Sequence, residues 1–172
     1  MSPKLRTLLI TVAVILPLDQ LTKHLVTSNI EPGDYWVPFA SLGGFLHIVH
    51  SRNPGAALGL APHVHGYFFV AFSLLALALL GSLFRRLEAA DRLSALSLGL
   101  ISAGAIGNNW CDRIFRGEVI DFLQFDLGIF VFPTFNVADS AIVIGVALLL
   151  LEVVTQETER GTAAKGAPEE RG

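Results

Sequence analysis

The sequence predicts an integral membrane protein that is mainly α-helical, with four transmembrane helices. Of its 172 residues, 52% are hydrophobic and only 16% are charged, and the mean hydropathy is +0.59. Soluble domains carry about 25% charged residues, so this deficit of charge favours a membrane protein. Four long apolar runs also follow one another along the chain, and the polar clusters gather at their ends. That placement indicates a polar site near one membrane face.

The four predicted spans cover residues 5–26, 66–84, 93–110 and 137–154 of a single domain, residues 1–155. A helix that crosses a bilayer needs about 20 mostly apolar residues. The second and fourth runs have this length, whereas the first and third reach it only with polar residues at one end. No small-residue cleavage site follows the first run, so we interpret it as a retained helix and not as a cleaved signal peptide.

Basic residues predict the orientation of these spans, because lysine and arginine in short loops stay on the cytoplasmic side. Lys4 and Arg6 precede the first span, and three arginines lie between the second and third. Both chain termini are therefore expected in the cytoplasm. The segments 28–65 and 112–135 then face outward.

The outward segment 28–65 is too long for a simple turn. It contains several glycines and prolines and a stretch rich in β-forming residues, so we expect a short β-hairpin or small sheet on the membrane surface. The last segment, 156–172, is polar and of mixed charge, with glycine and proline. We expect it to be a disordered cytoplasmic tail.

Two carboxylates, Asp121 and Asp139, stand directly before apolar sequence. An ionisable group near bilayer depth costs roughly 2.5 kcal/mol or more on insertion scales and usually marks function. Asn136 suits the N-cap position of the last helix, and capping alone would account for one polar residue there, but not for an acid deeper in the span. Two acids that share a site can act as general base and general acid on either side of a water molecule, as in aspartic proteases.

Three further polar clusters fall at the outer ends of the predicted spans or in the outer loops. Asp19 and Lys23 are spaced i, i+4, so they pair either as a structural link or as support for the site. Asp112 and Arg113 follow the third span, where an interfacial salt bridge is the simpler interpretation. The Asn53-Pro-Gly stretch reads as a turn. In the same stretch, small residues permit close approach of a chain or lipid; they include Gly55 and Ala56.

Several other chemistries fit the sequence poorly. A single cysteine, Cys111, excludes an intramolecular disulfide, and it is expected to be a small packing residue. The sequence has no Ser-x-x-Lys, Gly-x-Ser-x-Gly or His-Glu-x-x-His motif and no paired-cysteine metal spacing. We therefore expect no metal and no cofactor. The net charge of −3 does not suggest nucleic-acid binding.

Four motifs together resemble the lipoprotein signal peptidase family, also called signal peptidase II. They are Asp-Gln-Leu-Thr-Lys (19–23), Asn-Pro-Gly-Ala-Ala-Leu-Gly (53–59), Asp-Arg-x3-Gly-x3-Asp-Phe-Leu (112–123) and Phe-Asn-Val-Ala-Asp-Ser-Ala-Ile (135–142). The resemblance spans about residues 15–150. It implies four transmembrane helices with cytoplasmic termini, a small extracytoplasmic β-rich cradle and an amphipathic helix on the membrane surface.

The resemblance also implies which residues form the site. Asp121 and Asp139 match the catalytic aspartates. Residues that bind substrate or support the site match Asp19, Lys23, Asn53, Gly55, Ala56, Asp112, Arg113, Asn136 and Ala138. The family reads Gly-Asn, two residues, then Asp-Arg, whereas this chain has one residue more between Gly107 and Asp112. Spacing to Asp112 favours Asn109 as the family asparagine; the alternative is an inserted residue.

The resemblance implies an intramembrane aspartic endopeptidase of the bacterial cytoplasmic (inner) membrane, with its site near the outer face. Such an enzyme removes the signal peptide from diacylglyceryl-modified prolipoproteins before the lipid-bearing cysteine. Its partners would be that substrate and membrane lipid, with no obligate protein partner. Two alternatives stay open: a transporter that uses the acids as a cation site, and a non-catalytic paralogue that binds prolipoproteins. A transporter site lies near the bilayer midplane, whereas these clusters gather at one face.

Overall fold

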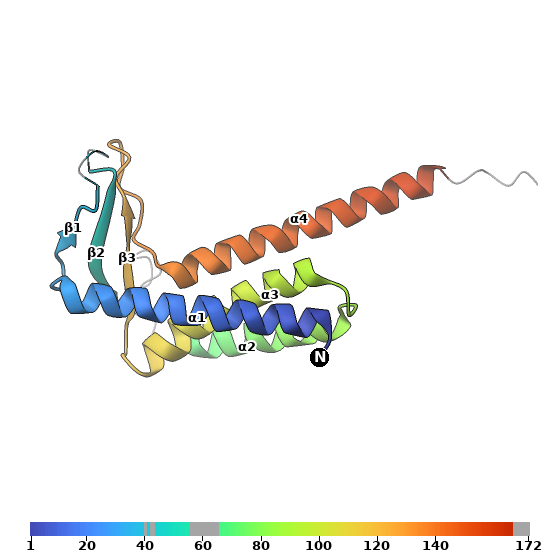
Figure 1. Cartoon of the computed structure of the whole chain (residues 1–172), viewed down its shortest axis with the longest axis horizontal. Helices are drawn as coiled ribbons and strands as arrows, with labels where there is room; N and C mark the ends of the chain where they lie inside the picture. The colour runs from blue at the N-terminus through green and yellow to red at the C-terminus, as the bar shows by residue number, and fades with distance from the viewer. Residues whose placement is uncertain (40, 42–43, 56–65, 167–172) are drawn as a thin grey trace, which may run out of the picture.

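The chain folds into a group of helices with a small sheet at one end (Figure 1). The computed structural model describes residues 1–39, 41, 44–55 and 66–166. Its helices are α1 (Pro3–Asn29), α2 (Gly66–Arg86), α3 (Arg92–Ala105), the π-helix η3 (Ile106–Ile114) and α4 (Val137–Gly166). Its strands are β1 (Tyr35–Trp36), β2 (Leu46–Asn53) and β3 (Val119–Phe125).

Three of the described helices are long and apolar enough to cross a membrane: Pro3–Asn29, Phe68–Arg86 and Val137–Thr155. They correspond to the first, second and fourth predicted spans. The third predicted span, 93–110, falls on α3, which has 14 residues, and on the first half of η3. Its polar end is therefore a π-helix, which is rare and often occurs at functional sites.

Helix α3 packs closely against α1 and α4 because small residues lie at the crossings. A Cβ atom on Gly99 would lie 2.9 Å from Thr11 Cβ on α1, and one on Gly145 would lie 2.8 Å from the Ser97 carbonyl oxygen. Ala95 and Ala103 of α3 are fully buried. Such close packing of small residues is the usual way in which helices associate in membranes. It holds α3 against both α1 and α4.

The sheet is antiparallel with strand order β1–β2–β3, and its strands run across the helix axes (Figure 1). Val26 of α1 packs with Ile120 and Phe122 of β3, so the sheet rests on the C-terminal end of α1. The prediction of strands within 28–65 is confirmed by β1 and β2. The pairing of β3 with β2 was not predicted, although the Val-Ile-Asp-Phe-Leu-Gln-Phe sequence is rich in β-formers.

Two expected features, the disordered tail and the amphipathic surface helix, are not found among the described elements as predicted. Helix α4 continues to Gly166, so the helix extends into a segment expected to be disordered from residue 156. The glutamate, glutamine, alanine and lysine residues there are good helix formers, which explains the extension. The amphipathic surface helix implied by the resemblance has no counterpart among the described elements, and residues 56–65 lie outside the described part of the chain.

Candidate active site

Asp139 is held at the start of α4 by a reciprocal cap. The backbone N–H of Asp139 donates to Asn136 Oδ1 (2.9 Å), and the backbone N–H of Asn136 donates to Asp139 Oδ2 (3.1 Å). This pattern is a capping box, with an aspartate in place of the usual glutamate. Asn136 is therefore the N-cap, as expected, and it fixes the orientation of the acid that follows it.

Asp121 lies in β3, opposite Ser51 of β2, and is 5% exposed. Its Oδ2 accepts a hydrogen bond from Asn53 Nδ2 (3.1 Å) and its Oδ1 accepts one from Asn136 Nδ2 (2.8 Å). Asn136 thus contacts both acids, through its side chain to Asp121 and through its backbone to Asp139. The two carboxylates predicted to share a site do lie together.

Asn108, and not Asn109, joins this cluster. Asn108 Nδ2 donates to Asp139 Oδ1 (2.7 Å), and Asn108 Oδ1 accepts from Lys23 Nζ (2.8 Å) and from Asn136 Nδ2 (3.1 Å). Asn109 Nδ2 instead donates to the Ala105 carbonyl (3.2 Å). The preference for Asn109 rested on its spacing to Asp112 along the sequence, whereas in the structure Asn108 is the residue that contacts Asp139 and Lys23.

The wider turn of η3 explains how the extra residue is accommodated. Asn108 and Asp112 both contact Lys23, so these two residues share one face of η3. Gly107 lies against Asp19, where a Cβ atom would come within 2.8 Å of Asp19 Oδ2. Gly107 therefore leaves room for the Asp19 carboxylate at this crossing of η3 and α1.

A buried charge cluster lies behind the two acids. Lys23 Nζ is 2.8 Å from Asp19 Oδ2 and 2.6 Å from Asp112 Oδ2, and all three side chains are almost fully buried. Asp19 Oδ1 accepts the backbone N–H of Ala138 (3.0 Å), and Arg116 Nη1 contacts Asp112 Oδ1 (2.7 Å). This cluster connects α1, η3 and the first turn of α4. The alternative of Asp112 pairing with Arg113 at the interface is not what the structure adopts.

The two acids open into a cavity of about 400 Å³. Residues from β2, η3, β3, α4 and the segment before α4 line it: Asn53, Asn108, Arg113, Val119, Asp121, Phe132, Pro133, Thr134, Phe135 and Asp139. The guanidinium of Arg113 lies over the Phe69 ring, 4.6 Å from its centroid. Its Nε and Nη1 are buried and have no hydrogen-bond partner within the described residues, so they are free to receive an acceptor.

Burial and charge shape the protonation of the acids. Burial raises the pKa of Asp121 from its ordinary range to about 6, and the nearby Asp139 carboxylate adds to this, while hydrogen bonds from Asn53 and Asn136 oppose it. A raised pKa favours the form of the pair in which one carboxyl group keeps its proton while the other is ionised. Within the described residues, no three histidine, cysteine, aspartate or glutamate side chains are grouped to hold a metal ion.

Most of the predicted site residues come together, and some contacts were missed. Gly55 lies beside the cluster, where its N–H donates to Asn53 Oδ1 (3.1 Å), while Ala56 lies outside the described residues. Gln20, whose amide bridges Asp19 and Asp112, was not predicted. The sequence did offer one indication of its role, because Gln20 lies between Asp19 and Lys23 in the 19–23 motif.

Comparisons with known proteins identify the family of this chain. The family model described as signal peptidase (SPase) II matches residues 11–155. The chain belongs to the signal peptidase II family. The lipoprotein signal peptidase of Geobacter metallireducens is 42% identical over 159 residues, which cover 91% of this chain and 96% of the relative. That of Listeria monocytogenes is 40% identical over 149 residues, covering 87% and 93%.

Solved structures agree as well. One bacterial membrane enzyme, determined at 2.3 Å, has a TM-score of 0.77 and 29% identity over 96% of this chain and 94% of that one. A second, at 1.9 Å, has a TM-score of 0.76 and 31% identity over 86% and 92%. The chain is therefore a membrane peptidase of this family.

The difference between the two asparagines is testable in this peptidase. We expect Asn108→Ala to lower kcat by about 10- to 100-fold, because it removes hydrogen bonds to two charged groups, Asp139 and Lys23. Asn109→Ala loses only a bond to a helix carbonyl and is expected to stay close to wild type. Steady-state cleavage rates of both variants check this. Equal effects of the two changes, or a larger effect at Asn109, would refute the assignment.

Proposed function

We propose that this peptidase removes the signal peptide from diacylglyceryl-modified prolipoproteins, cutting before the lipid-bearing cysteine, with Asp121 and Asp139 as its catalytic dyad. The observation that carries the proposal is the convergence of two carboxylates on one cavity, joined through Asn136. The name lipoprotein signal peptidase of the relatives supports the substrate class.

In the proposed mechanism one dyad member is ionised and the other is protonated. The ionised acid takes a proton from a water molecule between them, and that water attacks the scissile carbonyl carbon. The protonated acid donates a hydrogen bond to the developing oxyanion and then protonates the leaving amine. Neither a covalent intermediate nor a metal is required. The assignment of base and acid belongs to the pair, because the two groups titrate together.

The surrounding polar residues have separate proposed roles. Asn53 and Asn136 hold Asp121, and the two free donors of Arg113 point to contacts with substrate carbonyl groups. Lys23 and the two aspartates it contacts fix the first turn of α4, and with it Asp139, as positioning residues. The Ala138 N–H contributes through its bond to Asp19.

The same proposal places the enzyme in the bacterial inner membrane. Residues 1–155 form the peptidase domain, α3 together with η3 provides a fourth span, and both termini face the cytoplasm. The sheet and dyad then lie at the outer face. The diacylglyceryl chains of the substrate lie between helices in contact with membrane lipid, and no obligate protein partner is required.

The direct test is product analysis by mass spectrometry. Purified full-length protein in detergent is incubated with a diacylglyceryl-modified prolipoprotein and, separately, with the same precursor left unmodified. We expect one new N-terminus, at the lipidated cysteine, and little cleavage of the unmodified precursor. Cleavage at another position, equal cleavage of both precursors, or an intact lipidated precursor would each contradict the proposed function.

The raised pKa of Asp121 predicts an alkaline limit to activity. The pKa of about 6 belongs to Asp121 beside an ionised Asp139, so above this value the dyad holds no proton and lacks its general acid. We therefore expect kcat/KM to fall as the pH rises through about 6, where the last proton leaves the pair. The pH profile of kcat/KM checks this, and a rate that stays flat from about pH 5 to about pH 8 would contradict it.

Asn53 offers a way to move that limit. Its hydrogen bond to Asp121 Oδ2 favours the ionised carboxylate and lowers the pKa of that group. In Asn53→Ala, we expect this alkaline limb of the profile to move to higher pH, with an accompanying loss of rate. A lower rate with an unmoved limb would mean that Asn53 acts only on substrate binding.

A further inference from the structure

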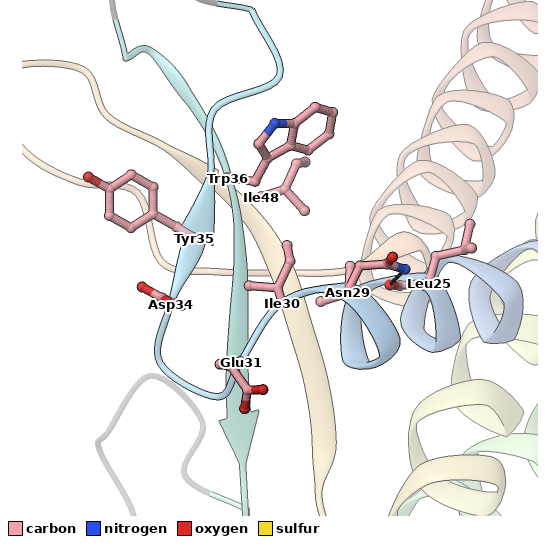
Figure 2. Close-up of a pocket in the computed structure, with 9 residues that line it drawn as sticks. Leu25, Asn29, Ile30, Glu31, Asp34, Tyr35, Trp36 and Ile48 are labelled. Carbon is pink, nitrogen blue, oxygen red and sulfur yellow. Dashed lines mark hydrogen bonds between the residues drawn. The ribbon is translucent and has the colours of Figure 1, made fainter.

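A second cavity, of about 520 Å³, lies between the outer end of α1 and the sheet, apart from the dyad. Figure 2 shows the residues that line it: Leu25, Val26, Asn29, Ile30, Glu31, Asp34, Tyr35, Trp36 and Ile48. None of these residues lines the cavity of the two acids. The mechanism proposed above makes no use of this cavity.

One rim of the cavity carries two carboxylates on a tight turn. The N–H of Asp34 donates to the carbonyl of Glu31 (3.0 Å), with Pro32 and Gly33 between them and a φ of 87° at Gly33. Proline followed by a glycine with positive φ is the pattern of a type II turn, whose end Cα atoms lie within about 7 Å of each other. The turn therefore keeps the backbones of two acidic residues close together.

This turn is attached to the sheet by His50, which is 1% exposed. The backbone N–H of His50 donates to the Asp34 carbonyl (3.0 Å), and its carbonyl accepts from Gly33 N–H (2.9 Å). Its ring Nδ1 lies 2.6 Å from the Ile30 carbonyl oxygen. The ion pairs found within the described residues involve neither Glu31 nor Asp34. The backbone of the rim is thus held in place, and its two carboxylates form no ion pair with the part of the chain that the structure describes.

The wall opposite the rim is apolar and continues along α1. Trp36 is 58% exposed beside Ile48, and Leu25 lies at the far side of the residues drawn in Figure 2. Leu18, Leu21 and Leu25 are all about half exposed, and their i, i+3, i+7 spacing places them on one helix face. Because α1 can cross a membrane, this leucine stripe runs from the cavity into the hydrocarbon region.

We propose that this cavity binds a membrane phospholipid whose headgroup ends in a primary ammonium, such as ethanolamine. The ammonium lies between Glu31 and Asp34, and one acyl chain follows the leucine stripe of α1. An amphiphile with a cationic end and long apolar chains matches the negative rim and the apolar wall together. A headgroup with net negative charge, such as glycerol phosphate, is disfavoured by the two carboxylates. The bound lipid anchors the sheet against the bilayer.

Tryptophan fluorescence tests this proposal. The chain has two tryptophans, so Trp110→Phe leaves Trp36 as the only reporter. The full-length protein is placed in vesicles that contain increasing fractions of brominated phosphatidylethanolamine, phosphatidylcholine or phosphatidylglycerol, since bromine quenches tryptophan on contact. We expect phosphatidylethanolamine to reach half-quenching at a fraction about threefold lower than phosphatidylglycerol does, the size typical of exposed ion pairs.

Variants of the two acidic residues at the rim test whether their charges cause the lipid preference. Glu31→Gln with Asp34→Asn should abolish the preference, whereas Glu88→Gln with Asp126→Asn removes the same two charges outside the cavity and should retain it. Equal quenching by all three lipids, or an unchanged preference in the rim variant, would overturn the proposal. Prolipoprotein cleavage in the same vesicles reports separately on the dyad, so failure of lipid binding is distinguishable from failure of the proposed function.

Discussion

Replacing either Asp121 or Asp139 with asparagine is expected to lower kcat by about 100- to 10,000-fold, the range for a positioned general acid or base. Asparagine preserves the shape of the side chain but can neither take a proton from water nor deliver one to the oxyanion and the leaving amine. Both acids line one cavity and are joined through Asn136. Removing either acid therefore disables the pair as a whole. We therefore expect the double variant to be hardly slower than either single variant.

The measurement is single-turnover cleavage of a lipidated prolipoprotein, so that product release does not hide the chemical step. Asp126→Asn is a suitable control, because Asp126 lies in the loop after β3 and its Oδ1 accepts the Gly128 N–H, a bond that asparagine retains. A retained melting temperature shows that each dyad variant is folded. A loss of less than tenfold at either acid, in a folded protein, would exclude the dyad mechanism.

Replacing Lys23 with methionine is expected to cost about 3–5 kcal/mol of stability, the typical cost of breaking a buried ion pair by removing one partner. Methionine fills a similar volume but leaves Asp19 and Asp112 buried without their shared cation. Arg116 continues to contact Asp112 from the more exposed side, so some compensation remains. Because Asp19 holds the Ala138 N–H, loosening of this cluster should also slow cleavage.

Thermal or denaturant unfolding in detergent micelles measures this cost. Arg52→Met removes the cation of a more exposed pair with Glu118 and should change stability by about 1 kcal/mol or less. Combining Lys23→Met with Asp112→Asn removes one of the stranded charges, and we expect it to recover part of the loss. If Lys23→Met were as mild as Arg52→Met, the cluster would not hold the start of α4 in place.

The local sequence pattern alone was enough to predict three of the helices and to select Asp121 and Asp139 as candidate site residues. Apolar runs of sufficient length predict α1, α2 and α4 wherever they fold, because backbone groups in a bilayer must be satisfied within a helix. Asp121 and Asp139 were identified because a charged group beside apolar sequence is costly unless it has a use. The N-cap role of Asn136 was likewise readable from its position before the last run.

Contacts between segments that are distant in the sequence could be identified only from the three-dimensional structure. Asn108 and Asn109 have the same side chain and adjacent positions, and only the π-helical turn decides which one meets Asp139. The pairing of β3 with β2, which brings Asn53 to Asp121, joins residues 68 positions apart in the sequence. Spacing rules act over one or two helical turns and cannot set such a register.

By itself the sequence determined that this protein is a mainly helical membrane protein and predicted a shared site for two acids, because hydropathy and the cost of misplaced charge are properties of each segment. The tertiary structure alone decided that Lys23 balances two buried aspartates, that Asn136 touches both acids, and that Glu31 and Asp34 share the rim of a separate cavity. These facts depend on distances between elements, and those distances are set by close packing of α3 against its neighbours and by the pairing of strands.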